Sequence, residues 1–436
     1  MTGPHPSTAR WAAPALFAAL VVVYVATMGR ALSFDVFAAN LASWHIAETG
    51  SPFVDLTDFP KLNNWPTREI WIVEAADGRD VIGRSSGVIA AAVPAYRLAG
   101  LLGFHDMDTV PASVTAAVLT AAAVTLLYVV LRRRLAQREA LLAALLFGLT
   151  TPVWSVAADG MWPHTVTVFG IMGMAWAADR ERWWLVGVFG GITLWGRLHA
   201  AVICAVVGLL LAWWRRSPAI AAKVAMTSGA LLALTCLWSH WMYGTWSPTA
   251  AYRIGDFTAN VEQSPVDVVN QLGLWISPGR GMLWWTPLLL VLGFALVRGW
   301  RDLPDWSRAL VVGGAGYTLA QLMLNRYTGG GSFFGYRIGL EMLACLTPAL
   351  ALSAHRMGRV ARRLFAPVAV LQLAVFAAGA VSSPALFPDA DDRWTRNEYL
   401  WWLGERPLFV GLVSGGAAVI GIVVWRMWTD PDLKRD

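Results

Sequence analysis

The sequence predicts an all-α polytopic membrane protein with about twelve transmembrane helices. Hydrophobic residues occupy 57% of the 436 positions and charged residues only 14%, whereas soluble domains carry about 25% charged residues. Apolar runs near the ~20-residue length that crosses a bilayer recur along the whole chain. Many of the 25 tryptophans stand at the ends of these runs, where indole rings meet the membrane interface.

The apolar runs define twelve predicted spans. They cover residues 11–30, 110–131, 138–156, 163–178, 183–196, 198–214, 220–240, 281–297, 308–324, 337–353, 364–381 and 407–425. Their even number puts both ends of the chain on the same side of the membrane. No internal repeat, low-complexity tract or linker interrupts them, so residues 1–436 are expected to form a single domain.

Basic residues gather in the short loops on one side of the predicted spans. They are Arg132, Arg133, Arg134, Arg138, Arg180, Arg182, Arg215, Arg216, Lys223, Arg298, Arg301, Arg308, Arg356, Arg359, Arg362, Arg363, Arg426, Lys434 and Arg435. By the positive-inside rule this side, with both termini, is predicted to be cytoplasmic in a bacterial plasma membrane. The long segments 31–109, 241–280, 325–336 and 382–406 then face the periplasm, and long loops commonly carry functional residues.

The first periplasmic loop, 31–109, contains three predicted elements. Residues 34–47 are amphipathic and are expected to form a helix on the membrane surface. Residues 69–82 alternate in polarity around Asp77-Gly78, which is a hairpin signal. Residues 88–102 are apolar but short for a span, so an interfacial or re-entrant helix is expected.

Charge and cysteine content exclude several classes of function. The net charge of +6 comes almost entirely from arginine in short loops, and these loops show no aromatic interleaving that indicates nucleic-acid binding. Cys204, Cys236 and Cys345 lie inside apolar runs, which implies neither disulfides nor a metal framework. No His/Asp/Glu spacing indicates a tight metal site. The sequence therefore predicts no cofactor, and it neither indicates nor excludes a divalent metal ion.

Asp35 is the first candidate for chemistry, because it follows the first span by only a few residues. A carboxylate at that position lies at the membrane surface, within reach of a lipid headgroup and of an acceptor arriving from outside. The alternative role for Asp35 is an N-cap of the helix that follows.

Two arginine motifs on the same face form a candidate phosphate site. Arg280 lies in the turn Ser-Pro-Gly-Arg-Gly, and Arg337 ends a glycine-rich segment that includes Gly330 and Gly331. Glycines let backbone N–H groups approach an anion closely, and an arginine can clamp phosphate oxygens bidentately. The alternative is a flexible loop whose arginine reaches the headgroups.

Further polar residues on this face are candidates either for the site or for structural roles. They are Asp55, Asp58, Arg84, His164, Arg197, Arg326, Tyr327 and Glu341. Glu341 stands four residues after Arg337, so an i,i+4 ion pair that merely neutralises the arginine is its favoured role. His164 could hydrogen-bond a sugar or phosphate, or serve as a structural histidine.

The order of these motifs resembles the GT-C superfamily of membrane glycosyltransferases, especially the bacterial relatives of protein O-mannosyltransferases and aminoarabinose transferases. The matching motifs are Asp35 after the first span, Asp77-Gly78-Arg79, Ser85-Ser86-Gly87, Pro94-Ala95-Tyr96, Trp162 with His164, Ser277 to Gly281, Trp285-Thr286-Pro287, and Gly330, Gly331, Gly335 and Arg337. One departure is Val36, where relatives often carry a second acid. The chain also lacks the large soluble C-terminal domain of some relatives.

The resemblance implies a GT-C fold and an inverting transfer of a monosaccharide from a polyprenyl-phosphate donor to a glycan, glycolipid or protein of the cell envelope. Asp35 would accept the proton of the acceptor hydroxyl, and Arg280 and Arg337 would stabilise the departing phosphate. Mannose and arabinose donors are the expected classes, because the arginine- and alanine-rich composition favours a GC-rich bacterium. The alternative is a transporter or flippase of a lipid-linked saccharide, which would favour polar groups along the spans and access from both sides.

Overall fold

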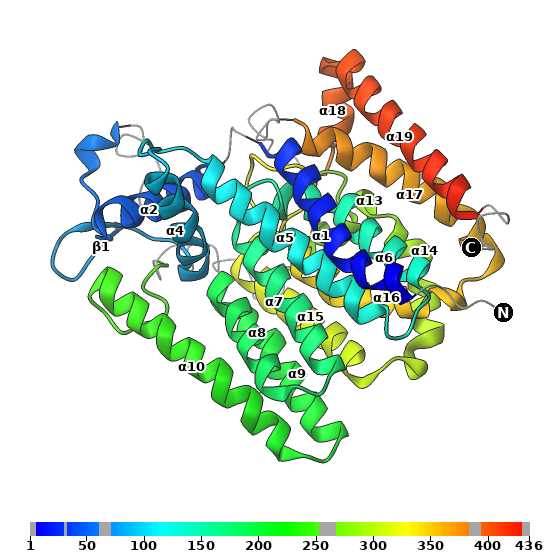
Figure 1. The fold of residues 1–436 in the computed structure, drawn as a ribbon, viewed down its shortest axis with the longest axis horizontal. Helices are drawn as coiled ribbons and strands as arrows, with labels where there is room; N and C mark the ends of the chain where they lie inside the picture. Colours follow the sequence, from blue (N-terminus) through cyan, green and yellow to red (C-terminus); the bar gives the residue numbers. More distant parts are fainter. Residues whose placement is uncertain (1–5, 30–32, 61–70, 253–266, 383–393, 430–436) are drawn as a thin grey trace.

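The computed structural model describes residues 6–29, 33–60, 71–252, 267–382 and 394–429, and these ranges are mainly helical (Figure 1). The longer helices are α1 (Pro6–Thr27), α2 (Phe34–Thr49), α4 (Ser86–Leu101), α5 (Val110–Leu131), α6 (Gln137–Leu149), α7 (Pro163–Asp179), α8 (Trp183–Gly196), α9 (Ala201–Trp214), α10 (Pro218–Tyr243), α12 (Val268–Ile276), α14 (Leu288–Gly299), α15 (Asp305–Leu324), α16 (Leu340–Ser353), α17 (Arg359–Ala380), α18 (Glu398–Glu405) and α19 (Pro407–Thr429). The short elements are α13 (Met282–Trp285), the strands β1 (Ile72–Glu74) and β2 (Asp80–Ile82), a π-helical turn Val153–Ala157, and 3₁₀ turns at Leu56–Asp58, Leu198–Ala200, Trp300–Asp302 and Ala354–Arg356.

Helices occupy all twelve segments that the sequence predicts as spans. The predicted 110–131 and 183–196 match α5 and α8 residue for residue. Two segments are interrupted near prolines: α13 and α14 are separated at Thr286 and Pro287, and α6 ends before Pro152. Proline explains both breaks because it lacks the N–H that a continuing helix needs.

Four of the described helices, α5, α10, α17 and α19, are long and apolar enough to cross a membrane. Large apolar side chains also cover outer surfaces of the molecule; Phe294, Val297 and Leu412 are each more than three-quarters exposed. A soluble protein rarely exposes contiguous apolar surface of this kind. The chain is therefore associated with a membrane, and the full set of twelve spans remains a prediction.

The first long loop folds into a small layer at one end of the bundle, at the left of Figure 1. The predicted hairpin is confirmed: β1 and β2 pair antiparallel with Glu74 opposite Asp80, and Gly78 takes a φ of +84° in the turn. Residues 69 and 70 of the predicted range lie outside the described residues. The N–H of Ala76 donates to the carbonyl of Tyr243 at 3.0 Å, which joins the hairpin to the end of α10.

Helix α2 differs from the expected surface helix. Side chains all around it are buried, including Ala38, Asn40 and Leu41, because α4 and β2 pack against it. The expectation of an amphipathic helix lying on the membrane is thus wrong for α2. The predicted helix at 88–102 does form, as α4, and it exposes Leu98 and Leu101 on its outer side.

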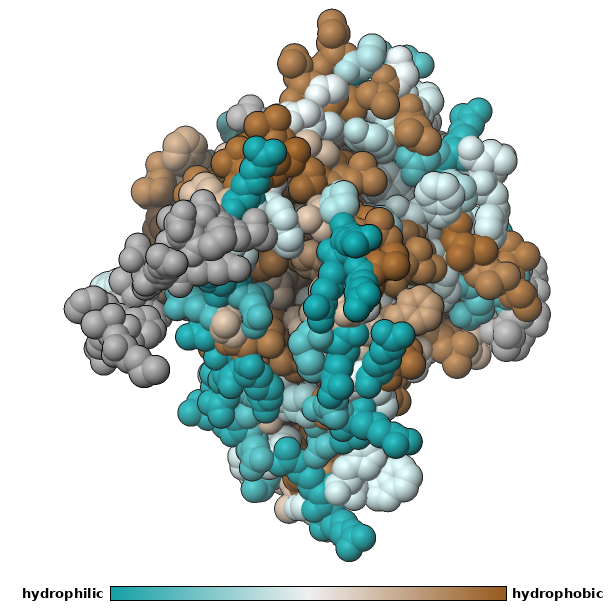
Figure 2. All heavy atoms as spheres, turned by 90° about the vertical axis from the view of Figure 1, so that its right-hand side faces the viewer, coloured by the Kyte–Doolittle hydropathy of each residue, from teal (hydrophilic) through white to brown (hydrophobic). Residues whose placement is uncertain are grey.

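The opposite end of the bundle carries the basic loops. Figure 2 looks toward that end and shows hydrophilic side chains gathered beside hydrophobic ones. Some of the arginines there form ion pairs: Arg133 and Arg134 share the buried carboxylate of Asp179, and Arg215 pairs with Glu181 at 2.6 Å. Lys434 and Arg435 of the predicted basic pattern lie outside the described residues.

Close helix contacts in the middle of the bundle depend on glycine. On α8, a Cβ added at Gly187 would collide with the carbonyl oxygen of Val224, and one at Gly190 would collide with Sγ of Cys204. Small residues at such crossings let helix backbones approach in membranes. Helix α8 is consequently packed between α7, α9 and α10.

Candidate functional site

Asp35 is the second residue of α2 and lies at the centre of a charged cluster. The N-cap of α2 is Ser33, whose side chain accepts from the N–H of Val36 at 3.4 Å. The proposed capping role of Asp35 is therefore wrong, and its carboxylate is turned to other partners. Oδ1 accepts hydrogen bonds from Nη2 of Arg84 at 2.7 Å and from Nε1 of Trp71 at 2.9 Å.

The second carboxylate oxygen of Asp35 contacts an arginine 302 residues away. Nη1 of Arg337 donates to Oδ2 of Asp35 at 3.0 Å. The side chains of Arg84 and Arg337 are each 15% exposed, and that of Asp35 is 32% exposed. These three groups, which we call the Asp35 cluster, thus form a recessed site that solvent still reaches.

The electrostatics of the Asp35 cluster favour an ionised carboxylate. Burial alone would raise the pKa of Asp35, but the charges of Arg84 and Arg337 and the hydrogen bond from Trp71 outweigh it and hold this pKa well below its usual range. The carboxylate is consequently ionised at neutral pH. With both arginines in contact, however, it is a weak proton acceptor.

The glycine-rich loop packs directly against Arg337. Gly329 and Gly330 have φ angles of +64° and +79°. A Cβ added at Gly329 would lie 3.1 Å from Nε of Arg337, and one at Gly330 would lie 3.6 Å from its Nη2. The structure therefore brings Gly330 to Arg337, as the motif predicts. The neighbouring Gly331 lies in the same loop and is half-buried.

Aromatic rings flank Arg337 and fix the plane of its guanidinium. Its Cζ lies 4.8 Å from the ring centroid of Trp162 and 5.2 Å from that of Phe333. Cation–π contacts of this kind hold an arginine in place without neutralising its charge. Within the described ranges, Nε of Arg337 has no hydrogen-bond partner.

Arg280 does not belong to the Asp35 cluster, although its motif predicts that it binds phosphate. Its side chain is fully buried and forms an ion pair with Glu398 at 2.5 Å, and Nη1 also donates to the carbonyl of Gly335 at 2.7 Å. Phe333 covers its guanidinium at 4.1 Å. Arg280 therefore links α18 to the glycine-rich loop, a structural role that its motif did not reveal.

Glu341 forms a second polar group deeper in the bundle, and its predicted pairing with Arg337 is wrong. Arg337 precedes the first turn of α16, so the i,i+4 geometry of a helix is absent. Instead Oε1 of Glu341 lies 2.9 Å from Nδ1 of His164 and accepts from Thr167 at 2.8 Å. The side chains of His164 and Glu341 are both fully buried. Of the two roles predicted for His164, this contact agrees with the structural one.

Arg197 extends this polar group toward α15. Nη1 donates to the hydroxyl of Tyr317 at 3.1 Å and to Oε1 of Gln321 at 3.0 Å, and His199 also hydrogen-bonds Gln321. Arg197 attracts Glu341 and repels Arg337 electrostatically. The deeper polar group thus stands next to the Asp35 cluster, and the positive charge of Arg197 within it is offset by the carboxylate of Glu341.

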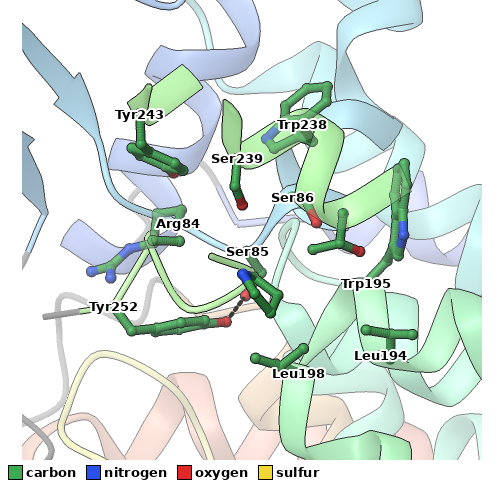
Figure 3. Close-up of a pocket in the computed structure, with 13 residues that line it drawn as sticks. Arg84, Ser85, Ser86, Leu194, Trp195, Leu198, Trp238, Ser239, Tyr243 and Tyr252 are labelled. Carbon is green, nitrogen blue, oxygen red and sulfur yellow. Dashed lines mark hydrogen bonds between the residues drawn. The ribbon is translucent and has the colours of Figure 1, made fainter. Parts of the chain in front are cut away.

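A narrow cleft of about 10 Å³, which is room for about one water molecule, opens beside Arg84 (Figure 3). Its walls include Trp195, Trp238 and Tyr252, and the hydroxyls of Ser85 and Tyr252 lie 2.6 Å apart. Nε1 of Trp238 is buried without a hydrogen-bond partner among the described residues. The cleft therefore offers aromatic surfaces and hydrogen-bonding groups next to the Asp35 cluster.

Four other candidate residues lie apart from the Asp35 cluster. Asp55 caps a 3₁₀ turn by accepting from the N–H of Thr57 at 2.9 Å, and Asp58 ends that turn on the surface. Arg326 is exposed, and Tyr327 is buried against Gly273. No contact in the described ranges joins any of the four to Asp35.

Asp159 is a buried acid that the sequence did not point to, and it contacts the segment that leads into α2. The N–H of Gly29, at the end of the first apolar segment, donates to its Oδ1. Burial raises the pKa of Asp159 to about 8 even though this hydrogen bond lowers it. Asp159 therefore anchors the chain just before it enters α2. Only its position after a predicted span offered a signal for it.

Among the residues that the structure describes, no three His, Cys, Asp or Glu side chains come together in a way that could hold a metal ion. The functional groups that the site offers are carboxylate, guanidinium and aromatic groups. No model of a known protein family matches the chain, and none of the curated proteins matches its sequence. The functional interpretation therefore rests on the geometry of the site.

Proposed function

We propose that the protein is an inverting glycosyltransferase that moves a monosaccharide from a polyprenyl-phosphate donor to an acceptor of the cell envelope on the periplasmic side. The observation that carries this proposal is the Asp35 cluster: one carboxylate held between Arg84 and Arg337, recessed but open to solvent. Glycosyl transfer from a phosphate needs a proton acceptor and a positive site for the leaving group. The cluster supplies both within hydrogen-bonding distance.

In the proposed reaction, the acceptor oxygen attacks the anomeric carbon while the bond from that carbon to the phosphate oxygen breaks. The proton of the acceptor hydroxyl goes to Asp35, and the electron pair of the broken bond leaves with the polyprenyl phosphate. Attack opposite the leaving group inverts the anomeric configuration. Arg84 takes the place that the motifs predict for Arg280, because Arg280 is buried against Glu398.

The low pKa of Asp35 suggests an order of binding. When a donor phosphate binds Arg84 and Arg337, it competes with the carboxylate for their positive charge. The pKa of Asp35 then rises toward its usual range, and the carboxylate becomes a better proton acceptor. The donor is therefore expected to bind before the acceptor hydroxyl can be deprotonated.

Asp35→Asn tests the chemical role of the carboxylate. Asparagine keeps the size of the side chain but cannot accept the proton, so turnover is expected to fall about 10²–10⁴-fold. The assay measures polyprenyl phosphate released by purified protein in lipid nanodiscs, with mannose- and arabinose-bearing donors. Asp55→Asn is the matched control. Near-normal turnover of Asp35→Asn would refute the assignment and direct attention to Asp55 or Asp58.

Arg84→Ala and Arg337→Ala test the phosphate clamp. Each loses a charge-assisted hydrogen bond in a recessed site, which costs about 1.5–3 kcal/mol or roughly 10- to 150-fold in donor affinity. Arg79→Ala is the control, since Arg79 lies exposed in the nearby hairpin and pairs with Asp77. Equal donor affinity in all three variants would contradict the clamp.

The alternative function is a transporter or flippase of a lipid-linked saccharide. The buried groups His164, Arg197 and Glu341 would serve such a role if they formed a path across the bilayer. They stand at the start of α7, just after α8 and at the start of α16, which are ends of helices on the predicted periplasmic side. This one-sided distribution favours the glycosyltransferase over a transporter. Translocation of a fluorescent lipid-linked sugar by proteoliposomes without formation of a transfer product would favour the transporter.

A further inference from the structure

A large apolar groove lies between α6, α14, α16, α17 and α19, on the side of the bundle that Figure 1 shows at the right. Its volume is about 600 Å³, within the range of about 300–1,000 Å³ that sites for small apolar ligands usually have. Leucines dominate its walls, among them Leu146, Leu292 and Leu350. The groove therefore suits an occupant that is apolar along most of its surface.

The two ends of the groove differ in charge. One end is lined by Thr150, Thr151 and Gln372, which are neutral; Gln372 already donates to the carbonyl of Thr150 at 2.8 Å. The other end is lined by His355 and Arg362 at the basic face. An occupant with a negative head and an apolar tail would lie with its head at the basic end.

The positive charge at the basic end is not neutralised within the described residues. Arg362 follows Arg359 and precedes Arg363 in the first turns of α17, and these three arginines are exposed and have no ion pair in the ranges described. Glu139 lines this end and caps its own helix, where Oε2 accepts from the N–H of Ala136 at 3.2 Å; its one negative charge is outnumbered by the three arginines. Counting only the residues that the structure describes, the head-group position therefore carries excess positive charge.

The length of the groove matches one leaflet of a bilayer. Arg362 and Gln372 are ten residues apart on α17, which corresponds to about 15 Å along a helix. The hydrocarbon core of a membrane is about 30 Å thick, so one leaflet offers about half of that length. Trp425 and Trp428 line the basic end, and tryptophan is typical of the level of the headgroups.

We propose that this groove binds an anionic phospholipid of the leaflet on the basic side, with its phosphate at Arg362 and an acyl chain along the leucines. The binding of an anionic lipid here does not depend on the glycosyltransferase proposal, whereas the exclusion of the donor as the occupant rests on it. A polyprenyl-phosphate donor fits it poorly, because the Asp35 cluster would hold the donor phosphate on the opposite face. The bound lipid fills the space between α14, α17 and α19 and stabilises their packing.

The test reconstitutes the purified protein in nanodiscs of phosphatidylcholine with a minority of phosphatidylglycerol that carries a photoreactive acyl chain. Crosslinks are expected on peptides of α6, α14 and α17. The variant Arg359→Gln/Arg362→Gln/Arg363→Gln should lose about fivefold in phosphatidylglycerol capture for each charge removed, since one basic residue near a charged surface contributes about 1 kcal/mol. The control Arg182→Gln/Arg216→Gln removes exposed arginines of the same face that do not line the groove.

A groove-filling variant keeps the test independent of the arginines. Leu292→Phe places a larger side chain inside the groove and should reduce crosslinking while the protein still elutes as a single folded species. Crosslinks spread evenly over all helices, or equal capture by the arginine variant and its control, would overturn the proposal. Displacement of phosphatidylglycerol by polyprenyl phosphate at equal concentration would also overturn it and assign the groove to the donor.

Discussion

Glu398→Gln is the sharpest test of whether Arg280 is structural or binds the donor. The substitution removes the negative charge that lies 2.5 Å from Nη1 of Arg280 while keeping the side-chain volume. The carbonyl of Gly335 and the ring of Phe333 remain as contacts of the guanidinium. Neither contact can balance a full charge.

The expected loss follows from the burial of both partners. The side chain of Arg280 is fully buried and that of Glu398 is only 4% exposed, so solvent cannot compensate the cation that is left behind. Removing one partner of a buried ion pair costs about 3–5 kcal/mol. Glutamine still accepts one hydrogen bond from Nη1, which places the expected loss of stability near the lower limit, at about 3 kcal/mol.

The measurement is thermal unfolding in detergent, followed by tryptophan fluorescence, together with donor turnover at a temperature where the variant stays folded. Arg280→Met/Glu398→Leu serves as the second arm. Removing both charges should be less harmful than removing either one, because no unpaired charge stays buried. If the single variants unfold like the wild type and Arg280→Met alone abolishes donor binding, then Arg280 belongs to the donor site and the structural interpretation fails.

Three further predictions concern strain, pH and orientation. Gly335→Ala should lose about 1–3 kcal/mol of stability because Gly335 holds a φ of +86°. The control Gly415→Ala should be neutral or stabilising, since its added Cβ meets nothing within 4 Å. Equal unfolding midpoints for the two variants would contradict this prediction. Burial raises the pKa of Asp159 to about 8, so the folded chain retains a proton that the unfolded chain loses near pH 4. The free energy of unfolding should therefore fall as the pH rises from about 4 to 8. Asp159→Asn should remove this dependence from unfolding midpoints measured across that range. Unchanged dependence in the variant would count against a buried proton. Arg79→Cys should react with an impermeant thiol reagent on intact cells and Arg216→Cys only after permeabilisation; the reverse pattern would overturn the predicted orientation.

The helices could be predicted from the sequence because their signal is local. An apolar run bounded by arginines or prolines, such as 110–131, defines its own helix regardless of what surrounds it. The hairpin was equally local, since Asp77-Gly78 specifies a turn that few other residues allow. The burial of α2 could not be predicted in this way, because the side chains that cover it belong to α4 and β2. The sequence of α2 alone does not show that both of its faces are covered.

The candidate site was predictable only in part, for a related reason. Asp35 and Arg337 stand out separately because each lies next to a predicted span on one face, and the structure joins them directly. Arg280 looks similar in its motif, but its partner Glu398 comes from a segment with no recognisable pattern. Nothing near Trp71 in the sequence indicates that its indole would hydrogen-bond Asp35.

The separation of Asp35 and Arg337 also has a consequence for how the protein is made. Asp35 and Arg84 leave the ribosome early, whereas Arg337 follows 302 residues after Asp35, which takes about 15–60 s at ordinary rates of synthesis. During that interval the carboxylate can pair with Arg84 but not with its second arginine. A nascent chain that stops before Arg337 therefore holds Asp35 with only one of its two arginine partners, and the complete Asp35 cluster forms only after most of the helices have been made.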